Sequence, residues 1–139
     1  MLTFVDANVF IGLFTEIDNE NQADQAEQLL IKAQNGEVDL VTGPPVFFEI
    51  AWVLGQRYKI ENDKVLNVLE AILLYPNLRV LDKEQVIAAI SLARATNSVF
   101  ADSYNAVSAG KVKAENVATF NNKHFARLGV RLYPLEEKR

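Results

Sequence analysis

The sequence predicts an α/β fold in which helices flank both faces of a mostly parallel sheet. Short apolar segments rich in β-branched and aromatic residues alternate with longer segments whose apolar residues recur at helical spacing. Strands and helices that alternate in this way form parallel sheets. The 139 residues are half hydrophobic and show no internal repeat or linker, so we expect a single domain over 1–139.

The first elements follow from apolar spacing. The apolar run at 2–5 predicts a strand, and apolar pairs four residues apart predict a helix at 9–14. Residues 16–21 are polar and predict a loop. An apolar stripe then predicts a helix over 22–35, with Gly36 as its C-terminal stop.

The middle of the chain holds a second strand and two apolar helices. The strand is expected at 38–42, where a Gly-Pro-Pro sequence ends it, and Pro45 suits the first position of a helix. That helix, 45–58, is unusually apolar. A further amphipathic helix over 62–75 ends at Pro76.

The rest of the chain continues the alternation. Asp82 is a good N-cap for the next helix, which carries acidic and amide residues near its start. The expected elements are a strand at 78–81, helices at 83–96 and 100–109, a strand at 117–120, a helical turn at 122–127 and a strand at 130–132.

Composition excludes several classes of protein. The absence of cysteine excludes disulfides and thiolate metal sites, and a single histidine excludes multi-histidine sites within one chain. No apolar run reaches the roughly 18 residues that span a bilayer, and no signal peptide is recognisable, so we expect a cytoplasmic protein with no membrane partner. The net charge of −4 argues against a large nonspecific nucleic-acid surface but is compatible with carboxylates that hold a cation.

Three carboxylates interrupt apolar stretches near the starts of expected helices: Asp6, Glu49 and Asp102. If these helices begin at one edge of the sheet, the carboxylates converge, and a hard divalent ion such as Mg²⁺ would remove their mutual repulsion. Each residue also has a simpler explanation. Asp6 could cap a helix, Glu49 could lie on a solvent-facing stripe or pair with an arginine, and Asp102 could be favoured by a helix dipole.

Four segments taken together resemble a known family. They are Val5-Asp6-Ala7-Asn8, Glu49 after Pro44-Pro45, Phe100-Ala101-Asp102, and Ala118-Thr119-Phe120-Asn121-Asn122-Lys123-His124-Phe125. Their order and the chain length resemble the PIN-domain family, most closely the small prokaryotic toxin-like (VapC-like) ribonucleases of toxin–antitoxin systems. The resemblance implies a three-layer α/β/α fold with a mostly parallel central sheet.

The resemblance also assigns roles to residues. Asp6, Glu49 and Asp102 would be the catalytic acids and would hold Mg²⁺, or Mn²⁺ in its place. Asn8 matches the small polar residue that supports the first acid in the family. Thr119 matches a polar position at the end of the fourth strand.

Asn121 departs from the pattern, because many PIN domains have a fourth acid there. Asparagine offers a carbonyl oxygen without charge, so we expect one tightly held ion, with any second ion brought by the RNA phosphate. Lys123 and Arg127 follow directly and are the candidates for RNA binding. His124 is either a polar surface residue or a general base.

The implied function is Mg²⁺-dependent hydrolysis of RNA phosphodiester bonds, with the protein acting as the toxin of a type II toxin–antitoxin pair. A cognate antitoxin and a homodimer are the expected protein partners, since the helices at 45–58 and 62–75 carry a surplus of apolar residues. The alternatives are a non-catalytic PIN-like interaction module, a PIN nuclease of RNA processing, and an aspartyl-phosphate phosphotransferase.

Overall fold

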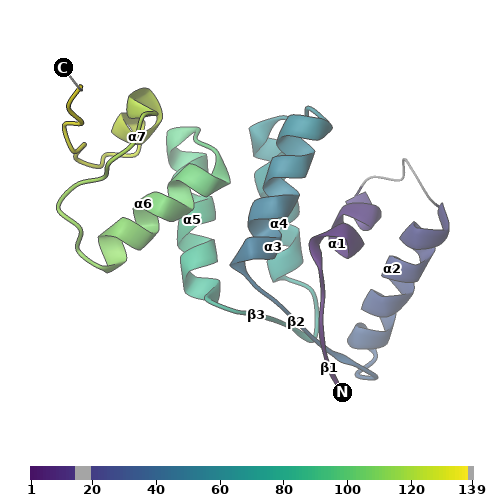
Figure 1. Cartoon of the computed structure of the whole chain (residues 1–139). Helices are drawn as coiled ribbons and strands as arrows, with labels where there is room; N and C mark the ends of the chain where they lie inside the picture. Colours follow the sequence, from purple (N-terminus) through teal and green to yellow (C-terminus); the bar gives the residue numbers. More distant parts are fainter. Residues whose placement is uncertain (15–19, 138–139) are drawn as a thin grey trace. The chain divides into compact units, whose positions relative to one another are not determined.

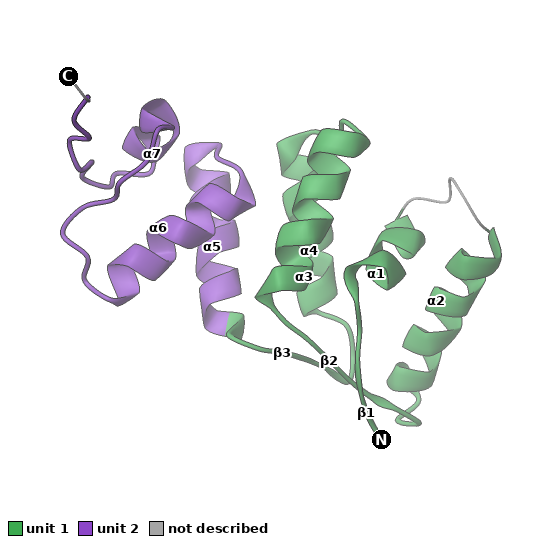
Figure 2. Cartoon of the chain, viewed as in Figure 1, with its two compact units in different colours: residues 1–83 green, residues 84–139 purple. Residues whose placement is uncertain are grey.

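The computed structural model describes residues 1–14 and 20–137 (Figure 1). Most of the loop expected at 16–21 lies outside the described residues. The chain forms two compact units, Met1–Lys83 and Glu84–Arg139 (Figure 2), and each is described by itself. None of the helices among the described residues has both the length and the apolar character needed to cross a membrane.

Unit 1 contains a three-stranded sheet in the order β1-β2-β3, and both neighbouring pairs are parallel. Its strands are β1 (Leu2–Phe4), β2 (Asp39–Thr42) and β3 (Leu78–Val80). In register, Phe4 lies opposite Val41, and Thr42 lies opposite Val80. The first three expected strands and their parallel direction are therefore confirmed.

Helices connect these strands, as parallel pairing requires. The connections contain α1 (Ala7–Phe14), α2 (Glu20–Gln34), α3 (Pro44–Trp52), the π-helix η1 (Val53–Arg57) and α4 (Asn62–Leu73). The helix expected at 45–58 begins one residue earlier, because Gly43 is the N-cap and Pro44 takes the first helical position. Its last part is a π-helix, in which the Tyr58 N–H donates to the Val53 carbonyl at 3.1 Å.

Burial follows the two-residue period of the strands. The inward set includes Val5, Leu40, Thr42, Leu78 and Val80, each at most 8% exposed. Their neighbours Leu2 and Phe4 point to the other face of the sheet and are both 57% exposed. The large buried side chains of unit 1 come mainly from α1, α3 and α4, and the Phe10 ring of α1 stacks on Tyr75 just after α4.

Unit 2 is built from α5 (Lys83–Thr96), α6 (Phe100–Lys111) and α7 (Asn122–Arg127). Helix α5 begins where the sequence predicts. Asp82, however, has a left-handed φ of 51°, whereas a side-chain N-cap normally has extended backbone. A small core of Ala106, Phe125 and Leu128, with partly buried hydrophobic residues around it, holds α7 against α6.

The strands expected at 117–120 and 130–132 are wrong as extended elements. One isolated parallel bridge joins Val117 to Leu132, through bonds from Val117 N to Arg131 O and from Tyr133 N to Val117 O, both 2.8 Å. The extended segment ends early because the Thr119 hydroxyl accepts a hydrogen bond from the Asn121 N–H at 3.0 Å, which turns the chain.

Candidate active site

Asp6 lies at the carboxyl edge of the unit 1 sheet, between β1 and α1. The Val5 N–H donates to the Val41 carbonyl at 2.8 Å, and the Thr42 hydroxyl donates to the Val5 carbonyl at 3.0 Å. These bonds fix the residue immediately before Asp6. The Asp6 Oδ1 atom accepts a hydrogen bond from the Ala7 N–H at 2.7 Å, while the residue as a whole remains exposed. Asp6 therefore binds the first backbone amide of α1, and the residue remains exposed to solvent.

The neighbouring strands end at the same level. The Leu81 N–H donates to the Thr42 carbonyl at 2.9 Å, so the chain stays paired for one residue beyond β3. A Cβ atom at Gly43 would lie 3.4 Å from the Leu81 Cβ, so the end of β2 and the residue after β3 are in ordinary contact. The carboxyl ends of parallel strands are where open α/β sheets bind ligands.

Glu49 lies in the second turn of α3, which starts from this edge. It is exposed, and so are Pro45 four residues before it and Trp52 three residues after it. These residues form the solvent-facing stripe of an otherwise buried helix. The cost of burying an unpaired carboxylate therefore does not arise for Glu49. Helix α3 packs against α1, which follows Asp6 directly, so both acids of unit 1 belong to adjacent elements at one edge.

Asp102 occupies the first turn of α6 in unit 2, where the helix dipole favours a negative charge. Its side chain is 17% exposed. Its Oδ2 atom lies 3.3 Å from Nδ1 of His124 on α7, whose side chain is 58% exposed. His124 thus contacts a predicted site residue. The sequence suggested a polar surface residue or a general base, and neither role includes this contact.

The remaining unit 2 candidates surround the start of α7. Asn121 is the N-cap of α7 but makes no side-chain capping hydrogen bond, and Thr119 binds its backbone instead. Lys123 and Arg127 are both exposed. Arg127 Nη1 donates to the Asn97 carbonyl at 3.1 Å, so this arginine has a contact within the fold as well as its charge.

Asn8 is exposed on α1 and lines a pocket of about 250 Å³ together with α2 residues, namely Gln22, Gln25, Ala26 and Leu29. The resemblance implied that Asn8 supports Asp6. In the structure the backbone amide of Ala7 makes the contact to Asp6, and Asn8 lies beside α2.

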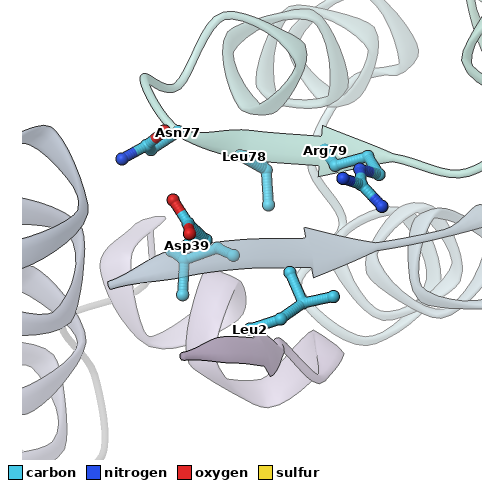
Figure 3. Close-up of a pocket in the computed structure, with 6 residues that line it drawn as sticks. Leu2, Asp39, Asn77, Leu78 and Arg79 are labelled. Atoms are coloured by element: carbon cyan, nitrogen blue, oxygen red, sulfur yellow. The ribbon is translucent and has the colours of Figure 1, made fainter. Parts of the chain in front are cut away.

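A larger pocket of about 490 Å³ lies at the opposite end of the strands (Figure 3). Leu2, Asp39 and Leu78, which line it, are the first residues of β1, β2 and β3. This pocket is therefore at the amino edge of the sheet, away from Asp6. Its one carboxylate, Asp39, serves below as a control for the candidate acids.

The donor set fits a hard divalent cation. All three candidate acids offer carboxylate oxygens, and Asn121 adds an amide oxygen, which suits Mg²⁺ or Mn²⁺ and not a thiolate- or imidazole-preferring metal. Among residues 1–14 and 20–137, no group of three or more His, Asp or Glu side chains is arranged to hold a metal ion. Asp6 and Glu49 belong to unit 1 and Asp102 to unit 2, so the three-carboxylate site stays a prediction.

Two features of the site have no signal in the sequence. The Ala7 amide binds Asp6 through its backbone, which any residue but proline could do. His124 and Asp102 are 22 positions apart, and their contact depends on how α7 packs on α6.

Comparison with known proteins gives one assignment. The family model described as PIN domain matches residues 3–130, which includes every candidate site residue and runs through both units. No curated protein sequence matches the chain significantly. PIN domains are generally nucleases that use divalent metal ions. Because the match covers nearly the whole chain, the protein belongs to the PIN domain family and has its nuclease-type α/β fold.

Proposed function

We propose that the protein is a Mg²⁺-dependent endoribonuclease, with Mn²⁺ as an alternative ion, in which Asp6, Glu49 and Asp102 are the catalytic metal-binding acids. The observation that carries the proposal is the position of Asp6. In a chain of the PIN family, it presents an exposed carboxylate at the carboxyl edge of a parallel sheet, on a backbone fixed by bonds to β2. The exposure of Glu49 on the helix that starts at this edge also supports the proposal.

The protein's own residues would act by charge and position. The three acids supply the negative charge that holds the ion, and the Ala7 amide keeps one Asp6 oxygen oriented. When bound, a divalent ion supplies an activated water nucleophile and charge stabilisation at phosphate. Lys123 is exposed beside the Asn121 turn and would contact RNA phosphate. Asn121 adds no charge, which favours one tightly held ion.

We further propose that the protein is the toxin of a type II toxin–antitoxin pair and forms a homodimer. The support is the presence of large apolar side chains at the surface of unit 1. Trp52 is 65% exposed and Leu74 is 81% exposed, although most apolar residues of α3 and α4 are buried. Exposed aromatic and aliphatic residues favour an interface. Sedimentation equilibrium gives the mass, and a monomer at micromolar concentration would contradict the dimer.

A second candidate function has one observation in its favour. Asn121 replaces an acid that many PIN domains carry, which fits a non-catalytic interaction module. Such a module has no use for a metal ion, so Mn²⁺ binding measured by calorimetry separates the two candidates. A PIN nuclease of RNA processing would share the chemistry and differ only in its RNA target.

The test is cleavage of a mixed RNA pool by the purified protein in Mg²⁺ or Mn²⁺, with EDTA as the metal-free control. We expect Asp6→Asn and Asp102→Asn each to abolish cleavage. Asp39→Asn is the matched control, because Asp39 is an exposed aspartate at the opposite edge of the same sheet. Cleavage that persists in EDTA, or in either site variant, would contradict the proposed active site.

A further inference from the structure

His124 contacts the one candidate acid that is largely buried. Its Nδ1 atom lies 3.3 Å from Oδ2 of Asp102, whose side chain is only 17% exposed. The imidazole projects from α7 and the carboxylate from α6, so the contact joins two helices. The two residues are 22 positions apart in the sequence.

Two further interactions hold the backbone of α7 in place. Phe125, the next residue, is 5% exposed and packs in the core cluster with Ala106 of α6. Arg127 Nη1 donates to the carbonyl of Asn97 in the turn between α5 and α6, at 3.1 Å. His124 therefore sits on a helix whose backbone is held at the next residue, Phe125, and again at Arg127.

A carboxylate that serves as a metal ligand binds more tightly when a neighbouring group fixes its orientation. An unrestrained carboxylate must lose rotational freedom on binding, and groups that orient ligating side chains raise metal affinity. An N–H on Nδ1 is a donor that matches one carboxylate oxygen and leaves the other to face an ion.

We propose that His124 is a positioning residue, whose Nδ1 orients the Asp102 carboxylate for binding a divalent cation. The proposal rests on the proposed function only in taking Asp102 as a metal ligand. His124 itself touches neither ion nor RNA in this role. Its removal therefore weakens ion binding without removing a ligand.

The geometry makes a specific prediction about substitutions. The Nδ2 atom of asparagine is separated from Cα by the same number of bonds as Nδ1 of histidine, whereas the glutamine amide nitrogen lies one bond farther out. His124→Asn should therefore keep the contact with Asp102, and His124→Gln should misplace it. His124→Leu removes the donor and keeps a side chain of similar bulk.

The experiment is titration of Mn²⁺ into the purified full chain by calorimetry at one fixed pH, without RNA. We expect the Kd to rise about 10- to 100-fold in His124→Leu and His124→Gln. In His124→Asn we expect a change of less than about threefold, because the donor is retained. Thermal unfolding of each variant by circular dichroism checks that the fold is kept, which the 58% exposure of the His124 side chain favours.

Two results would overturn the proposal: wild-type Mn²⁺ affinity in His124→Leu, or equal weakening in the Asn and Leu variants. Asp102→Asn measured in parallel separates this inference from the function. If Asp102→Asn binds Mn²⁺ as the wild type does, Asp102 is not a ligand and both proposals fail. If the wild type binds Mn²⁺ through Asp102 but cuts no RNA, the proposed nuclease activity is wrong. The Mn²⁺ affinities of the His124 variants then still test whether His124 orients Asp102.

Discussion

The Ser103 hydroxyl is the clearest place where a small substitution should stabilise the protein. Ser103 follows Asp102 in α6 and is 0% exposed. Its Oγ atom is buried and has no hydrogen-bond partner among the described residues. Leaving a buried hydroxyl unsatisfied costs about 1–3 kcal/mol, so the folded state bears a penalty that alanine would remove.

The magnitude follows from three contributions to the free energy of unfolding. Removing the unpaired hydroxyl restores about 1–3 kcal/mol, and alanine gains about 0.5 kcal/mol in helix propensity over serine. The small void left by one oxygen atom costs about 0.5 kcal/mol. Ser103→Ala should therefore be more stable by about 1–3 kcal/mol, which corresponds to a Tm higher by about 3–12 °C.

Urea unfolding monitored by circular dichroism measures this change, with the m-value as the check on two-state behaviour. Ser108→Ala is the matched control, because its Oγ donates to the Tyr104 carbonyl at 2.9 Å in the same helix. That variant gains the same propensity but loses a hydrogen bond, so its stability should be unchanged or lower. A loss of stability in Ser103→Ala would refute the reasoning, since it would mean that the hydroxyl has a partner. RNA cleavage should be unaffected, because the residue is fully buried.

Two other predictions concern pH and RNA contacts. Burial raises the pKa of Tyr75 above its usual 10.0, so the unfolded chain loses the phenolic proton at a lower pH than the folded chain and stability falls as pH rises above about 10. Tyr75→Phe keeps the stacking on Phe10 but removes the titrating group. Between about pH 9 and about pH 11, its urea midpoint should therefore fall less than that of the wild type. An equal fall in both proteins would contradict the assignment. Lys123→Ala should weaken RNA binding and reduce its salt dependence by about one ion, with little change in Tm. Arg127→Ala should have the same effect on RNA binding. It should also lower the free energy of unfolding by about 0.5 kcal/mol, because it loses the hydrogen bond to Asn97. Filter binding over a salt series and thermal unfolding measure both, and an unchanged salt slope for Lys123→Ala would exclude it from the RNA contact.

Patterns that depend on neighbours in the sequence predicted the structure well. The apolar runs gave β1 to β3, and helical spacing gave the helices of both units to within a few residues at their ends. Local chemistry also placed a helix start in the Gly-Pro-Pro segment. Helix α5 begins at Lys83 as expected, although Asp82 before it does not have the extended backbone of an N-cap. These features follow from backbone preferences and from amphipathic periodicity, which are readable in a short window.

Features that depend on distant contacts could not be read in this way. A strand at 117–120 requires a partner along its whole length, and the Thr119 turn limits pairing to Val117. The exposure of Glu49 depends on which side of α3 its neighbours cover, because an almost wholly apolar helix has no polar face to indicate its orientation. The contact between Asp102 and His124 depends on the packing of Phe125, which no spacing rule encodes.

The π-helical turn after α3 has a consequence for how the chain length can vary in evolution. A π turn holds one residue more than an α-helical turn, so deleting one residue within Val53–Arg57 would leave an ordinary helix with the same ends. Glu49 precedes the turn and would keep its orientation. A deletion between Pro44 and Glu49 would instead rotate the carboxylate about 100° around the helix axis. Homologues with one residue fewer should therefore have lost it after the acid and not before it.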